Sequence, residues 1–194
     1  RSVAGLGDLS ASEAITSLAR KGMVVERGGE IRFAHDLLRE ATYEWLGRYK
    51  RQVLHEHAAR VLQSDNRPAP GVLAIHYDLA ENKPLAFDYA LKAAEASEKV
   101  NSLVEAEYYF TKALDNAYDE QTQAVANEQM ANFLFRSRRY DEAEQYFDRI
   151  EEYYQAINDR KGLLRAEVNR IAAALNRGRI SAQHAVARLE SCVY

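Results

Sequence analysis

Helix-breaking residues are almost absent from the middle of this 194-residue chain. The stretch from Val72 to Leu175 is rich in Ala, Glu, Leu and Arg, and it contains one glycine, Gly162, and one proline, Pro84. This composition favours continuous helix, because Gly and Pro are the residues that interrupt it. Six of the nine glycines lie in the first 47 residues instead. We therefore expect a mixed N-terminal domain, residues 1–47, and an all-helical domain, residues 48–194.

The N-terminal domain has the pattern of a helix followed by a β-hairpin. Ser10 and Glu13 have the spacing of a capping box, which predicts a helix from there to about Arg20. Lys21-Gly22 would end this helix. The β-prone runs 23–25 and 31–33 flank Gly28-Gly29, and paired glycines favour the positive φ angles of a tight hairpin turn. A helix leading into a two-stranded wing predicts part of a winged helix.

The helical domain contains a sequence repeat. A small residue, an aromatic residue and an aliphatic residue recur at positions i, i+4 and i+7, with a period of 37 to 39 residues between the later copies. This pattern is typical of the second helix of tetratricopeptide-like (TPR-like) hairpins, in which the small residue allows a close helix crossing and the aromatic residue fills the gap between hairpins. The two clear triads are Ala106, Phe110, Ala113 and Ala143, Phe147, Ile150, and the weaker ones are Leu73, Tyr77, Ala80 and Ala182, Val186, Leu189.

Each second helix should follow a first helix with its own apolar stripe. We expect the first hairpin to comprise residues 48–63 and 71–80, about four hairpins to stack, and the last helix to end at Val193. The predicted fold class is mostly α, with a partial winged helix followed by an αα-solenoid of TPR-like repeats. The stripes of the later first helices are Ala90, Ala93, Ala94, then Met130, Ala131, Leu134, then Leu164, Val168, Ile171.

The segment from Phe33 to Tyr43 resembles a known family. It fits the pattern Phe-x-His-x-Leu-(Leu/Ile)-Arg-(Asp/Glu)-Ala-x-Tyr of STAND-type signalling ATPases, which include large ATP-binding LuxR-type regulators and the ATPases attached to some cyclases and kinases. The resemblance implies a winged helix that lies between a nucleotide-binding core and a helical-repeat sensor. It extends more weakly to Arg48, Lys50, Arg51, Leu54, His55, Ala58, Ala59, His76 and Tyr77.

The resemblance gives one residue a chemical role. It implies that His35 contacts the β-phosphate of ADP in an intact parent protein and holds a closed state; imidazole N–H groups are suitable donors to phosphate. The alternative is that His35 only caps or packs the junction between strand and helix. The sequence has no Gly-x-x-x-x-Gly-Lys-(Ser/Thr) loop. We therefore expect no cofactor in this chain and no enzymatic activity, with ATP or ADP held by the nucleotide-binding domain of the same parent chain.

A TPR-like stack presents a concave face that usually binds proteins or peptides. We expect first-helix side chains to line it, although about half of these positions would then be ordinary solvated helix surface. We expect the seven tyrosines 108, 109, 118, 140, 146, 153 and 154 to pack between hairpins. The candidate binding residues are Asp88, Leu91, Glu95, Lys99, Val125, Glu128, Asn132, Arg136, Arg165 and Asn169.

Several function classes are disfavoured by the sequence. The single cysteine, Cys192, excludes an internal disulfide, and the side chains of His55 and His57 would point about 200° apart on a helix, unlike a zinc-binding pair. We expect no metal site and no catalytic group. No apolar run approaches the roughly 20 residues of a membrane span. A net charge of −3, with ten basic and eight acidic residues in positions 1–63, makes DNA binding by this chain an unfavoured alternative.

Together these features predict a cytoplasmic, non-catalytic regulatory and protein-interaction segment. By the family resemblance it would belong to a STAND-type ATPase that regulates transcription or signalling, and its repeats would sense a protein or peptide effector. Two alternatives remain open at this stage. The chain could be a free-standing TPR-like scaffold without an ATPase switch, or its repeats could enclose a small molecule.

Overall fold

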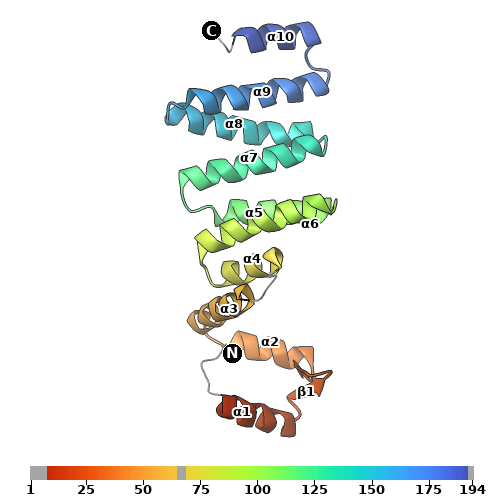
Figure 1. Cartoon of the computed structure of the whole chain (residues 1–194), viewed down its shortest axis with the longest axis vertical. Helices are drawn as coiled ribbons and strands as arrows, with labels where there is room; N and C mark the ends of the chain where they lie inside the picture. The colour runs from red at the N-terminus through yellow and green to blue at the C-terminus, as the bar shows by residue number, and fades with distance from the viewer. Residues whose placement is uncertain (1–7, 65–68, 192–194) are drawn as a thin grey trace. The chain divides into compact units, whose positions relative to one another are not determined.

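The computed structural model describes residues 8–64 and 69–191, and their fold is mostly α, as the sequence predicts (Figure 1). These residues form ten helices and one two-stranded sheet. The chain divides into two compact units, residues 1–82 and 83–194. This division lies one helical hairpin beyond the boundary expected from glycine content, so the domain limits 1–47 and 48–194 stay a prediction.

The first unit begins with a helix and a hairpin. Helix α1 (Asp8–Arg20) is followed by Gly22, whose φ of +70° lets the chain reverse into strand β1 (Val24–Arg27). Strand β1 pairs antiparallel with β2 (Glu30–Phe33), and Val24 lies opposite Phe33. Gly28 and Gly29 form the two-residue turn, with φ of +62° and +79°. The predicted capping box is wrong: α1 begins at Asp8, so Ser10 lies inside the helix.

Three more helices complete the first unit: α2 (Asp36–Trp45), α3 (Arg48–Gln63) and α4 (Pro70–Leu79). Helices α3 and α4 pack together as the predicted first hairpin. Leu73 and Tyr77 are buried in it, and the Tyr77 hydroxyl donates a 2.7 Å hydrogen bond to Gln63 Oε1. Ala80, the third member of that weaker triad, is the half-buried C-cap of α4. An ion pair between Arg48 and Glu81 also joins α3 to the end of α4.

The described part of the second unit, residues 83–191, forms three helical hairpins. Helices α5 and α6, α7 and α8, and α9 and α10 pack pairwise, and α8 also packs against α9. Figure 1 shows these six helices following one another along the unit. The helices are α5 (Lys83–Lys99), α6 (Leu103–Asn116), α7 (Glu120–Arg136), α8 (Tyr140–Ala156), α9 (Arg160–Asn176) and α10 (Ala182–Ser191).

Both clear triads are buried, and their small residue occupies the same position in each helix. Ala106 and Ala143 are fully buried, and each is the fourth residue of its helix, α6 or α8. The aromatic residues four positions later, Phe110 and Phe147, are also buried. The Phe110 ring lies 5.3 Å from the ring of Phe133 on α7, measured between centroids, so the triad of one hairpin contacts the next hairpin. The predicted repeat is confirmed here.

The weak third triad is wrong. Ala182 is exposed and Val186 is 53% exposed, whereas Ala185 is 3% exposed. Ala185 is again the fourth residue of its helix. Helix α8 has 17 residues against 14 in α6, and the α9–α10 link (177–181) is longer than the α7–α8 link (137–139). The longer helix and the longer link together move the buried position along the sequence.

One first-helix stripe is also partly wrong. The expected stripes of α5 and α7 are buried, but on α9 only Ile171 is buried, while Leu164 and Val168 are exposed. Helix α9 buries Gly162 and Ala166 instead. Small residues permit a close approach to α8, so the larger side chains of α9 are turned outward.

Most helices of both units end in the same way. Glu81, Asn101, Arg138, Asn158 and Gly178 follow helices and have φ between +55° and +69°. After each of them an N–H bonds a carbonyl five residues earlier, as in the 2.9 Å bond from Arg139 N to Leu134 O, which is the Schellman motif. The α6–α7 link differs, because Ala117 at the end of α6 has an extended backbone.

Ion pairs with the spacing of the repeat connect successive hairpins. Arg139, at the start of α8, donates to Glu107 of α6 at 2.6 Å, and Arg177, after α9, donates to Glu144 of α8 at 2.6 Å. Glu107 and Glu144 each follow the buried alanine of their helix. The Arg177 side chain is 10% exposed and also pairs with Asp141. These contacts connect successive hairpins in addition to the apolar packing.

Candidate functional site

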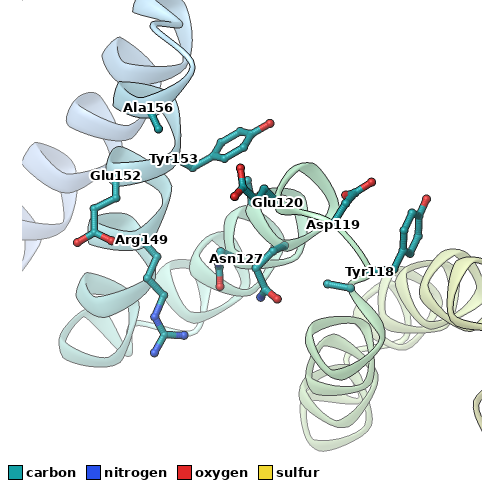
Figure 2. A pocket seen from close by; sticks show the side chains of 11 residues that line it. Tyr118, Asp119, Glu120, Asn127, Arg149, Glu152, Tyr153 and Ala156 are labelled. Carbon is teal, nitrogen blue, oxygen red and sulfur yellow. The ribbon is translucent and has the colours of Figure 1, made fainter.

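One groove of the second unit lies where the helix-end pattern changes. A groove of about 750 Å³ opens between the α6–α7 link, the start of α7 and one side of α8. Figure 2 shows Tyr118, Asp119 and Glu120 on one wall, and Arg149, Tyr153 and Ala156 of α8 on the other. The lining residues are Ala117, Tyr118, Asp119, Glu120, Gln123, Ala124, Asn127, Arg149, Glu152, Tyr153 and Ala156.

A reciprocal capping box holds the link side of the groove. The Asp119 Oδ1 atom accepts a 2.7 Å hydrogen bond from the backbone N–H of Thr122, and Thr122 Oγ1 accepts one from the backbone N–H of Asp119 at 3.1 Å. The hydrogen bond from the Thr122 backbone lowers the pKa of the Asp119 carboxyl below its usual value. The groove therefore carries a fixed negative charge beside the N-terminus of α7.

Two tyrosines form aromatic parts of the walls. Tyr118 is 49% exposed, and its ring meets the ring of Phe87 on α5 edge-on at a centroid distance of 6.2 Å. Tyr153 packs against Tyr154 at 5.4 Å. Tyr154 packs between hairpins as expected, because its hydroxyl meets Glu128 of α7 and Arg165 of α9. Tyr109 is buried beside Tyr108 of the same helix. The expectation is wrong for the half-exposed Tyr118 and Tyr108. Exposed aromatic faces in a groove are available for contact with a ligand.

Asn127 is the unusual polar residue of the groove. Its side chain is 4% exposed, and its Oδ1 atom has no hydrogen-bond partner among the described residues. A buried acceptor left without a partner costs about 1–3 kcal/mol. Asn116 is equally buried, but its Nδ2 donates to the carbonyl of Lys112 at 3.0 Å. Of these two buried asparagines, Asn127 therefore carries this cost, in a helix where asparagine is already a poor helix former.

The ten predicted concave-face residues lie elsewhere. None of them lines the groove, because Val125, Glu128, Asn132 and Arg136 lie on a different side of α7 from Glu120, Gln123, Ala124 and Asn127. Asp88, Glu95, Lys99, Val125, Arg136 and Arg165 are exposed, and Leu91, Glu128, Asn132 and Asn169 are half-buried. That this face binds a partner stays a prediction.

The structure connects three of these ten residues to neighbouring helices. Arg136 of α7 donates to both carboxylate oxygens of Glu98 on α5, at 2.8 and 2.9 Å. Lys99 lies near this pair in a smaller hollow between the α5–α6 and α7–α8 links. Glu128 and Arg165 meet at one hydroxyl: Tyr154 donates to Glu128 Oε2 at 3.3 Å, and Arg165 Nη2 donates to the Tyr154 oxygen at 3.0 Å. The first contact joins α5 to α7, and the second joins α7 to α9 through Tyr154 of α8.

His35 is the N-cap residue of α2. Its side chain is exposed and makes no capping hydrogen bond, and its carbonyl accepts from the backbone N–H groups of Leu38 and Arg39. The imidazole therefore does not cap the helix, which removes one half of the structural alternative. A contact with nucleotide phosphate stays a prediction.

A histidine pair that the sequence pattern did not single out connects the helices of the first unit. The Nδ1 atoms of His55 on α3 and His76 on α4 lie 3.0 Å apart, and His55 Nε2 lies 3.0 Å from the Tyr43 hydroxyl of α2. In this contact one Nδ1–H donates a hydrogen bond and the other Nδ1 accepts it. Burial, followed by the charges of His76 and Arg51, lowers the pKa of His55, and burial lowers the pKa of His76. The contact requires that at least one imidazole is neutral.

Other groups give no further candidate site. Among the described residues no group of three His, Cys, Asp or Glu side chains is arranged to hold a metal ion. Within those same ranges no helix is long and apolar enough to cross a membrane. Cys192 and the predicted helix end at Val193 lie outside the described residues.

Comparison with known proteins gives no identification. No protein-family model, no curated protein and no solved structure matches the chain. The resemblance of residues 33–43 to STAND-type ATPases therefore stays a prediction from the sequence.

The packing of Tyr154 on Gly162 gives one testable prediction. A Cβ atom at Gly162 would overlap three ring carbons of Tyr154. We expect Gly162→Ala to lower the free energy of unfolding by about 1–3 kcal/mol through overpacking, although alanine favours helix. In a Tyr154→Ala background the same change should be neutral or stabilising. Denaturant unfolding of the four variants measures this coupling, and a more stable Gly162→Ala single variant would contradict it.

The histidine pair gives a prediction about pH. Because the pKa values of His55 and His76 are lowered in the folded state, the unfolded chain takes up protons more readily. The resulting stability is fully present above the ordinary histidine pKa of about 6.5, and it is lost as the pH falls through the lower folded values. Unfolding of the first unit, followed between pH 8 and pH 5, should show this loss. His76→Asn should reduce the slope, whereas exposed His57→Asn should not; equal slopes in all three proteins would contradict the assignment.

Proposed function

We propose that this chain is a non-catalytic, cytoplasmic protein-interaction segment that recognises a peptide or protein through its TPR-like repeats. The observation that carries this proposal is the groove between the α6–α7 link and α8, which combines the exposed Tyr118 and the half-buried Tyr153 with the buried, unpartnered Oδ1 of Asn127. A groove of about 750 Å³ with a few convergent polar groups is typical of binding sites. A stack of hairpins supports such a surface without any catalytic group.

The resemblance of residues 33–43 supports a wider proposal. In a STAND-type ATPase that regulates transcription or signalling, the repeats would bind the effector and the helix and hairpin of the first unit would contact the nucleotide-binding domain. Effector binding changes such a switch only if the effector binds one of its states more tightly than the other. The exposed His35 side chain is compatible with a nucleotide contact in that parent protein.

Selection of peptides tests the interaction function. We expect panning of a random phage-displayed dodecapeptide library on the immobilised chain to enrich peptides that bind with micromolar Kd in isothermal titration calorimetry. The same calorimeter should detect no heat of binding for MgATP. A library that yields no peptide binding more tightly than about 1 mM would contradict the proposal, and so would micromolar binding or hydrolysis of ATP by the chain itself.

A further inference from the structure

The groove carries an excess of negative charge. Among its lining residues, Asp119, Glu120 and Glu152 are acidic and Arg149 is the one basic residue. The Arg149 guanidinium lies over the Tyr146 ring, 5.4 Å from its centroid, so the guanidinium already makes a cation–π contact within α8. The Asp119 carboxyl is kept ionised by its capping hydrogen bonds. A cationic group entering the groove would balance charge that the chain itself leaves uncompensated.

The aromatic walls fit the same ligand chemistry. Tyr118 comes from the α6–α7 link and Tyr153 from α8, and Figure 2 shows them on opposite sides of the groove. A Lys ammonium or an Arg guanidinium is attracted to the face of a tyrosine ring within about 6 Å. An acidic or phosphorylated segment would instead meet three carboxylates. Charge and aromatic surface therefore favour a basic side chain.

Asn127 adds a requirement for a hydrogen-bond donor. Its Oδ1 is an acceptor without a partner, and the terminal torsion of asparagine is broad, so the carboxamide can turn toward a donor in the groove. The backbone N–H of a peptide is such a donor. A ligand that joins a cationic side chain to backbone N–H groups satisfies all three features together, and a Lys or Arg residue within a peptide is the simplest ligand of this kind.

We propose that the groove between the α6–α7 link and α8 binds a Lys or Arg residue of a peptide, with Asn127 Oδ1 accepting a hydrogen bond from the peptide backbone. This inference rests on the proposed interaction function and names the chemistry of its partner. The cationic side chain lies between Asp119, Glu120 and the two tyrosines. The Asn127 Oδ1 atom accepts a hydrogen bond from a backbone N–H of the peptide.

The test uses small probes that separate these contributions. N-acetyl-lysine-N′-methylamide supplies a cation and backbone N–H groups, N-acetyl-glutamate-N′-methylamide reverses the charge, and n-butylammonium lacks the backbone. Each is titrated into the ¹⁵N-labelled chain. We expect the lysine probe to shift the amides of residues 117–127 and 149–156 saturably at millimolar concentration. The glutamate probe should leave them unshifted, and n-butylammonium should bind at least fivefold more weakly than the lysine probe.

Two matched variants on α7 complete the experiment. Asn127→Leu should weaken binding of the lysine probe at least fivefold and raise the Tm, because it removes the unpartnered acceptor. Asn132→Leu makes the same chemical change outside the groove and should leave binding unchanged. The inference is overturned if the lysine and glutamate probes bind equally, if n-butylammonium binds as well as the lysine probe, if the shifts lie outside the groove, or if Asn127→Leu keeps full binding.

The outcomes also separate this inference from the proposed function. Peptides that bind tightly after panning but shift amides on the face of Glu95, Glu128 and Arg165 would keep the interaction function and overturn the assignment of the groove. A failure of panning together with silent probes would overturn both.

Discussion

The second unit depends on the burial of one small side chain per hairpin. Ala106, Ala143 and Ala185 are each the fourth residue of a second helix, and all three are buried. A small side chain at this place lets neighbouring helices approach closely, and the aromatic residue four positions later fills the adjoining space in α6 and α8. Close packing makes such positions sensitive to added volume, so they determine how closely neighbouring helices pack. The repeat-spaced ion pairs of Arg139 and Arg177 add contacts between successive hairpins.

The groove arises where this regular pattern is interrupted. The α6–α7 link lacks the residue of left-handed conformation that follows most other helices. A capping box at Asp119 begins helix α7 instead. The interruption places two tyrosines, several carboxylates and Asn127 around one concave surface. Sites that bind ligands often keep polar groups that the folded protein alone would not favour. Asn127 has this character. The other buried asparagine, Asn116, donates a hydrogen bond to a backbone carbonyl, whereas the Oδ1 atom of Asn127 has no hydrogen-bond partner among the described residues.

The sequence predicts the regular part of the fold and little of the site. The triads of α6 and α8 are correct because periodicity reports directly which side of a helix is buried. The triad of α10 is wrong because α8 is longer than α6 and the α9–α10 link is longer than the α7–α8 link. Both lengths change the phase of the repeat, and neither can be read from helical periodicity alone. The groove and the pair of His55 and His76 depend on which helices come together in space. Their local signals, an asparagine inside a helix and two ordinary histidines, carry no information about their partners.

The most direct test of this account is the stability of the chain with a leucine at the buried fourth position of α8. If that position sets the packing of the hairpins, Ala143→Leu should lower the free energy of unfolding by about 1–3 kcal/mol. Ala182→Leu, at the exposed position of the discarded triad, should change it by less than about 0.5 kcal/mol. Denaturant unfolding that gives equal effects for the two variants, or a larger loss for Ala182→Leu, would contradict the hairpin packing described above.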